Sequence, residues 1–125
     1  MTDYESGVCN INQNESRKRY AGGLLSLFAV SFISVSYILN GSLMLLLLVA
    51  LTSIFGVQGI LQGRENFCVA HAKQGTHRTG NETEQVSDEG DKEADSSKAD
   101  SMILKSVLTG LALTASVYVI DIFLI

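Results

Sequence analysis

Two cysteines and two histidines are the side chains with the most chemical potential in this 125-residue chain. Cys9 lies near the N-terminus, whereas Cys68, His71 and His77 follow one another closely. If a helix includes residues 68–71, Cys68 and His71 lie one turn apart on one face. Two thiolates and two imidazoles form a ligand set that zinc accepts. Zinc bound by Cys9, Cys68, His71 and His77 is therefore one interpretation of these residues.

Two other interpretations of these side chains remain open. A structural zinc site usually contains a paired C-x2-4-C motif, whereas the cysteines here stand far apart at positions 9 and 68. The second interpretation is a redox or sulfur-handling thiol pair, in which Cys68 reacts and Cys9 resolves. The third is two unconnected thiols and two surface histidines. We expect the third, with no catalytic residue and no bound cofactor or metal.

Two long apolar segments dominate the first half of the chain and must position these residues. The segments 20–39 and 42–61 contain no charged residue, and only Asn40 and Gly41 separate them. Each has about the 20 residues that a helix needs to cross a hydrocarbon core of roughly 30 Å. Asn-Gly favours a turn that reverses the chain. The sequence therefore predicts a transmembrane helical hairpin at 20–62.

An acidic stretch separates this hairpin from a third apolar segment. Residues 82–100 are rich in Asp and Glu, and Val86 is their only sizeable apolar side chain. Because burying so little cannot offset the entropy lost on folding, we expect a disordered tether there. A third transmembrane helix is expected at 102–125, with Lys105 and Asp121 near its ends. A buried amphipathic helix is the alternative for this last segment.

These features predict an all-α membrane protein: a transmembrane helical hairpin plus a third transmembrane helix after a disordered acidic tether. The expected parts are a cytoplasmic N-terminal segment with a basic cluster at 1–19, the hairpin at 20–62, a cytoplasmic loop with the tether at 63–101, and the third helix at 102–125. The lysines and arginines all flank the spans on one side, which is typical of the cytoplasmic side. We expect a multi-pass protein of the cell membrane, with a cytoplasmic N-terminus and a C-terminus at the exterior face.

Small residues indicate how the three helices pack, because apolar surface alone gives no preference for protein over lipid. The expected contact sets are Gly22, Gly23, Ser26 and Ala29 on the first helix, Gly56, Gly59 and Gly63 on the second, and Ser106, Gly110, Thr114 and Asp121 on the third. We expect the first two sets to face each other and the third to pack inward or against a partner. Asn12 with Glu15 has capping-box spacing, which predicts that the first helix begins before position 20.

Short motifs within about residues 8–75 also resemble a known family. They are Cys9-Asn10-Ile11, Glu15 with Arg17 to Arg19 and Gly22, Gly59-Ile60-Leu61-Gln62, and Phe67-Cys68-Val69-Ala70. This frame resembles small uncharacterised prokaryotic membrane proteins that have a two-helix hairpin and a cysteine after the second helix. It is more distantly similar to the two-helix membrane domain that occurs alone or attached to rhodanese sulfurtransferases. That resemblance implies sulfur chemistry at Cys68, while Val69 stands where that domain typically has proline.

Function is restricted mainly by the motifs that the sequence lacks. It has no glycine-rich phosphate loop and no aromatic-basic surface for nucleic acid, so we do not expect an enzyme, a transporter acting alone or a nucleic-acid-binding protein. We expect a non-catalytic accessory or assembly subunit of a larger membrane complex. Its partners would be the lipid bilayer and other membrane subunits or a second copy. The alternative is a thiol-dependent redox, sulfur-handling or metal-binding component that uses Cys68 and Cys9, with zinc as the metal.

Overall fold

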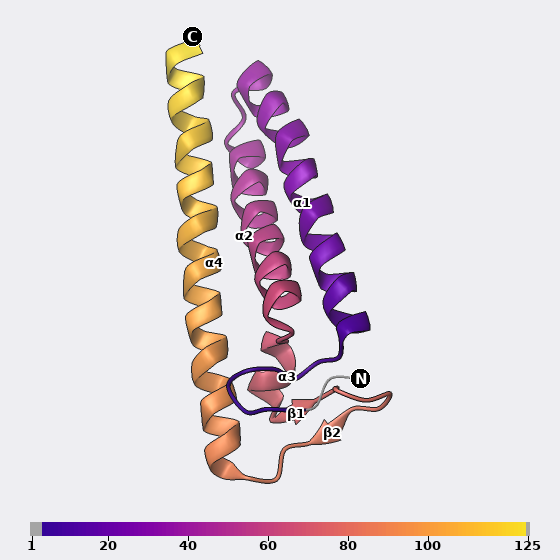
Figure 1. Ribbon diagram of the computed structural model, residues 1–125. Coiled ribbons are helices and arrows are strands. Elements are labelled where there is room, and N and C mark those ends of the chain that lie inside the picture. Colours follow the sequence, from indigo (N-terminus) through magenta and orange to yellow (C-terminus); the bar gives the residue numbers. More distant parts are fainter. Residues whose placement is uncertain (1–3, 125) are drawn as a thin grey trace.

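Three long helices lie side by side in the computed structural model, which describes residues 4–124 (Figure 1). In chain order the elements are α1 (Gln13–Asn40), α2 (Leu43–Glu65), α3 (Val69–Gln74), β1 (Thr76–His77), β2 (Glu84–Gln85) and α4 (Glu89–Leu124). Helix α2 lies between α1 and α4 and packs against both. Residues 1–3 of the expected N-terminal segment, and Ile125 at the expected exterior C-terminus, lie outside the described residues.

Helices α1, α2 and α4 are each long and apolar enough to cross a membrane. Large apolar side chains cover their outer surfaces, and Phe55 and Phe123 are 71% and 84% exposed. So many exposed apolar side chains are unusual on a protein that faces water. The predicted mostly helical fold with three apolar helices is therefore confirmed.

The hairpin forms where the sequence predicted it, although its helices extend beyond 20–62. The side chain of Asn12 accepts a hydrogen bond from the Glu15 backbone N–H at 2.9 Å, so α1 begins at Gln13. At the other end Gly41 adopts a left-handed conformation with φ of 68° and donates its N–H to the carbonyl of Tyr37. Such a conformation favours glycine and ends a helix. Both the early start of α1 and the turn are therefore confirmed.

Glycines bring the backbones of α1 and α2 into contact, as predicted. A Cβ atom at Gly23 would lie 2.7 Å from the carbonyl oxygen of Gly56 and 2.7 Å from the nitrogen of Ile60. A Cβ atom at Gly59 would lie 2.8 Å from the carbonyl oxygen of Arg19. No side chain fits at either position without a shift of backbone. We call this line of contacts the glycine seam; Gly22 lies outside it, because nothing would approach its Cβ within 4 Å.

The predicted small-residue face of α4 packs inward against α2. A Cβ atom at Gly110 would lie 2.9 Å from the backbone nitrogen of Ile54. Ser106 and Asp121 on the same face are buried. The small residues of all three helices are therefore used largely within the chain.

The expected disordered tether at 82–100 is wrong over its second half, because α4 already begins at Glu89. The carboxylate of Asp95 is fully buried. It accepts hydrogen bonds from the Tyr4 hydroxyl and the Gly7 backbone N–H, both at 2.7 Å. A buried carboxylate that accepts two hydrogen bonds stabilises the fold. The prediction of disorder considered only apolar burial and therefore missed this contribution.

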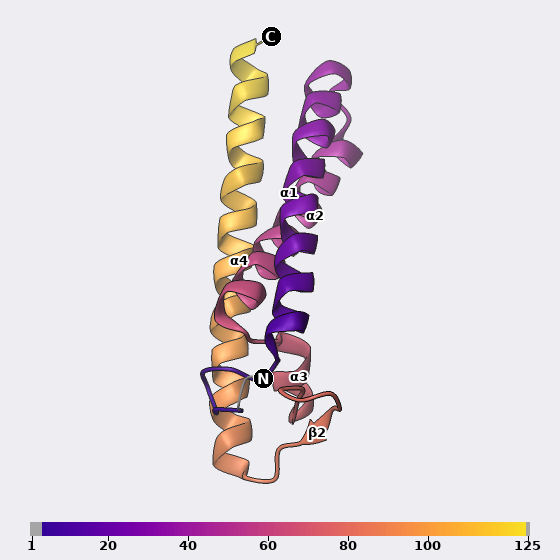
Figure 2. The same ribbon diagram turned by 45° about the vertical axis from the view of Figure 1, so that its right-hand side comes forward.

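A small core explains the rest of this correction. Ala99 and Met102 of α4 pack against Phe67 and Ala72 in one buried cluster. The apolar partners of the first turns of α4 therefore include residues of the segment after α2. Figures 1 and 2 show α3 and the strands gathered at this end, beside the first turns of α4. The expected 63–101 loop is thus largely folded, and we call α3, β1, β2 and the loops between them the folded unit. The third helix is longer than the expected 102–125.

The glycine seam can be tested with two adjacent positions. Gly23→Leu forces α1 and α2 apart, and we expect it to destabilise the protein by roughly 1–3 kcal/mol, as overpacking does. Gly22→Leu adds the same side chain in open space and should change stability little. Thermal unfolding followed by circular dichroism in mild detergent measures both. Equal unfolding temperatures for the two variants would contradict the seam.

Candidate functional site

Cys68 lies at the break between α2 and α3. Helix α2 ends at Glu65 and is capped by Asn66, whose φ of 52° is left-handed. Cys68 is extended and forms the N-cap of α3. The side chain is almost enclosed, since the residue is only 3% exposed. The thiol is therefore held in a folded corner, whereas the sequence placed it in a loop.

The side chain of Asn10 holds the Cys68 backbone on both sides. The Cys68 N–H donates to Asn10 Oδ1 at 2.6 Å, and Asn10 Nδ2 donates to the Cys68 carbonyl at 3.0 Å. Asn10 is itself fully buried. A carboxamide that satisfies both backbone groups of a residue restricts its position. Sequence reasoning did not select Asn10 as a site residue, although it stands in one of the motifs that carry the family resemblance.

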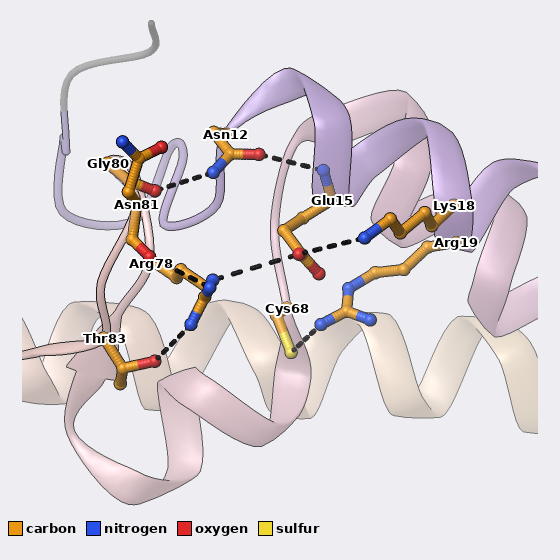
Figure 3. Close-up of polar contacts among 9 residues, drawn as sticks. All are labelled: Asn12, Glu15, Lys18, Arg19, Cys68, Arg78, Gly80, Asn81 and Thr83. Carbon is orange, nitrogen blue, oxygen red and sulfur yellow. Dashed lines mark hydrogen bonds and ion pairs between the residues drawn. The ribbon is translucent and has the colours of Figure 1, made fainter.

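Arg19 contacts the thiol directly. Its Nη2 atom lies 3.2 Å from Cys68 Sγ and donates a hydrogen bond to it (Figure 3). A guanidinium N–H stabilises negative charge on an acceptor more strongly than a neutral donor does. The Nε atom of Arg19 is buried and has no hydrogen-bond partner among residues 4–124. From the sequence, Arg19 was interpreted as part of a basic cluster that marks topology, with binding of anionic lipid as the alternative, and not as a partner of Cys68.

An open groove of about 560 Å³ lies between α1 and α2 and reaches Cys68. Arg19, Gln58 and Gln62 supply its polar lining, and Gly22 lies in its wall. The Oε1 atom of Gln58 is buried without a hydrogen-bond partner in the described part of the chain. The groove therefore combines a thiol, a cation and amide groups, and its volume is in the range of small-molecule sites. We call it the Cys68 groove.

The two histidines form contacts within the folded unit. The Nδ1 atom of His71 lies 2.7 Å from Thr76 Oγ1. Burial, and then the charge of Arg19, lower the pKa of His71, which favours the neutral imidazole at neutral pH. The ring of His77 stacks on Tyr4 with a centroid distance of 4.4 Å. Burial, followed by the hydrogen bond to Asp95, raises the pKa of Tyr4 and keeps its hydroxyl a donor.

The structure does not bring the candidate metal ligands together. Between positions 4 and 124, no group of three or more Cys, His, Asp or Glu side chains could hold a metal ion. Cys9 pairs through its backbone with Glu5, and no disulfide joins it to Cys68. His71 instead contacts Thr76, which follows Gly75, the C-cap of the short helix α3. The zinc site of Cys9, Cys68, His71 and His77 is therefore not assembled.

The N-terminal segment still folds back over this end of the hairpin. Ile11 forms a parallel bridge with Arg78, and Asn12 Nδ2 donates to the Gly80 carbonyl at 2.8 Å (Figure 3). Arg78 in turn lies 3.9 Å from the Glu15 carboxylate. These contacts hold the N-terminal segment where the Asn10 side chain can bond the backbone of Cys68.

Comparisons with known proteins found no family model, curated protein or solved structure that matches this chain. The resemblance to prokaryotic hairpin proteins and to the rhodanese-associated domain stays a prediction from motif residues. The functional argument is therefore based on the Cys68 groove and the side chains that line it.

Proposed function

We propose that this chain is a multi-pass membrane protein whose Cys68 groove carries out thiol chemistry on a small molecule. One observation carries the proposal: the Cys68 thiol receives a hydrogen bond from Arg19 in a groove of small-molecule size. Packing of a thiol in an apolar core does not require a charged hydrogen-bond donor such as a guanidinium next to the sulfur. Reactive cysteines are typically found next to a cation, and the groove that Cys68 helps to line gives a small molecule an approach to it.

The reaction class is exchange at a sulfur–sulfur bond. The Cys68 thiolate attacks one sulfur of a small disulfide or persulfide, and a new bond forms between that sulfur and Sγ. The original sulfur–sulfur bond breaks, and its electron pair leaves on the other sulfur as a thiolate. No external oxidant is required, because the substrate sulfur is reduced as Sγ is oxidised. The Arg19 guanidinium donates a hydrogen bond to Sγ and therefore lies beside the attacking atom.

Burial limits the substrate to small molecules. Cys68 is 3% exposed, so a disulfide on the surface of another folded protein would not reach Sγ. The amides of Gln58 and Gln62 line the same groove as Cys68 and can accept hydrogen bonds from a polar substrate or donate them to it. Cys9 has no role in this proposal, because the exchange needs only one attacking thiol, that of Cys68.

The distribution of basic residues supports a cytoplasmic location for this end of the molecule. All nine lysines and arginines lie at or near the end that holds the N-terminal segment, α3 and the strands. The positive-inside rule places such an end in the cytoplasm. At about 1.5 Å per residue, the 36 residues of α4 extend roughly 54 Å, which exceeds a hydrocarbon core of roughly 30 Å. The start of α4 and the folded unit would therefore project from the membrane.

A non-catalytic accessory or assembly subunit is the second candidate function. Most of the small residues that suggested it are used within the chain, but Gly22 remains open in the wall of the Cys68 groove. A helix of another membrane protein packs closely against such a position. The accessory-subunit function therefore depends on the part of the Cys68 groove around Gly22, where a partner helix would pack.

The thiol proposal predicts fast, Arg19-dependent chemistry at Cys68. Purified protein in mild detergent should form a mixed disulfide at Cys68 with a small disulfide such as oxidised glutathione, as mass spectrometry would show. Arg19→Gln should slow this step by about tenfold, because it removes a charge-assisted hydrogen bond. Lys18→Gln, which removes the neighbouring charge, is the matched control and should leave the rate unchanged.

Two further variants make this test decisive. Cys9→Ser should retain the reaction at Cys68, whereas Cys68→Ser should abolish it, with circular dichroism confirming that every variant is folded. A Cys68 rate equal to that of an unfolded peptide thiol, and unaffected by Arg19→Gln, would rule the proposal out.

The orientation is testable by labelling intact cells with a membrane-impermeant maleimide. Cysteine introduced by Gly41→Cys in a Cys9→Ser, Cys68→Ser background should be labelled from outside. Thr83→Cys in the same background lies in the exposed loop at the other end and should be labelled only after lysis. The reverse pattern would place the Cys68 groove outside the cytoplasm.

The accessory-subunit candidate predicts a different result for Gly22→Leu. If a partner helix packs there, this variant should remain folded but lose the larger assembly, measured as native mass after gentle detergent extraction. Wild-type protein that is extracted without any partner would argue against this candidate.

A further inference from the structure

A second cavity, of about 350 Å³, lies beside the glycine seam on a different face of α1 from the Cys68 groove. Its lining runs along α1 from Gln13 to Leu24 and includes Gly63 and Asn66 at the end of α2. The absence of a side chain at Gly63 lets α1 approach here, since a Cβ atom would lie 2.7 Å from the Ser16 carbonyl oxygen. We call this space the Arg17 cavity.

The lining of the Arg17 cavity changes from polar to apolar along α1. Gln13, Ser16 and Arg17 lie at the end next to the folded unit, while Ala21 and Leu24 lie farther along the apolar helix. At about 1.5 Å per residue, Gln13 and Leu24 are roughly 16 Å apart along the axis. Such a gradient, beside a helix long enough to span a membrane, matches an amphiphile whose polar end faces the aqueous side.

The hydroxyl of Ser16 indicates what the polar end of that amphiphile must offer. Ser16 is 3% exposed, and its Oγ atom is buried without a hydrogen-bond partner among the described residues. A buried hydroxyl without a partner lowers stability, so an acceptor in the cavity would compensate for it. A phosphate oxygen is such an acceptor.

Arg17 provides the charge. It forms no ion pair within residues 4–124, whereas the neighbouring Lys18 lies 3.7 Å from Glu15 and Arg19 contacts Cys68. A guanidinium binds phosphate oxygens through two parallel hydrogen bonds. The residues that line the cavity include no Asp or Glu to pair with a choline or ethanolamine group. The site therefore favours a headgroup with net negative charge.

We propose that the Arg17 cavity binds an anionic glycerophospholipid. Its phosphate contacts the Arg17 guanidinium and the Ser16 hydroxyl, and an acyl chain lies along Ala21 and Leu24. The apolar half of the cavity selects a lipid over free phosphate, because a soluble anion would leave that half empty. This site uses neither Cys68 nor the groove beside it, so it stands independently of the thiol chemistry.

Native mass spectrometry of delipidated full-length protein tests this site, with dioleoyl phosphatidylglycerol as the probe. Arg17→Gln should weaken binding by about tenfold, as expected for loss of a charge-assisted phosphate contact. Ser16→Ala should weaken it by a smaller factor. Lys18→Gln removes an equal charge outside the cavity and should change binding less than about twofold. Cys68→Ser should leave lipid binding unchanged, whatever its effect on thiol chemistry.

Three outcomes would overturn the proposal. Equal losses for Arg17→Gln and Lys18→Gln would indicate general attraction of the basic cluster for anionic lipid. Equal affinity for dioleoyl phosphatidylcholine would show that the site does not select lipids by the charge of the headgroup. Binding of glycerophosphoglycerol as tightly as the whole lipid would identify a soluble phosphate ester as the ligand. Circular dichroism of each variant separates loss of binding from loss of folding.

Discussion

The backbone contact between α1 and α2 at the glycine seam is the constraint on which the rest of the structure depends. Helices in lipid gain little by covering apolar surface, so their association depends on how closely they pack. Gly23, Gly56 and Gly59 permit contact between main chains and thereby determine the relative depth of the two helices. That depth places Arg19, in the second turn of α1, beside the residue that follows α2. The contact between Arg19 and Cys68 is therefore a consequence of the seam.

The seam also creates space on either side. Two helices that touch along a narrow line of glycines leave grooves where their larger side chains diverge. The Cys68 groove and the Arg17 cavity lie on different faces of α1. Arg19 lines the groove, whereas Arg17 lines the cavity. Because successive helical residues point about 100° apart, a run of three cations reaches three environments. Lys18 pairs on the surface, while Arg17 and Arg19 each line a cavity.

The N-terminal segment joins the long apolar helices to the folded unit. Asn10 fixes the Cys68 backbone, and the hydrogen bonds of Asp95 connect Tyr4 and Gly7 to α4. These polar contacts are buried, where an unmade hydrogen bond costs more than at a surface. They hold the buried Cys68 against Arg19, away from bulk water, where a lower effective dielectric constant strengthens the interaction of charge with a polarizable sulfur.

The sequence by itself determined the features that depend on neighbouring residues. Two uncharged runs around Asn40-Gly41 were sufficient to predict the hairpin. The Asn12 cap was predicted from residues three positions apart, and the glycine seam from small residues at matching depths in an antiparallel pair. Most of the fold could be predicted in this way, because helix length, capping and turn geometry are local properties.

Only the tertiary structure decided the site and the first turns of α4. Asn10 and Arg19 both contact Cys68, although Cys68 lies 58 and 49 positions from them in the chain, and no periodicity links these residues. The same is true of Asp95, whose partners Tyr4 and Gly7 come from the opposite end of the sequence, so the acidic segment was mistaken for a tether. The expected zinc site is not assembled, although Cys68, His71 and His77 are close in sequence. Nearness in sequence did not bring the histidine rings together with the cysteines. Contacts between distant residues depend on packing, and packing is not encoded in local spacing.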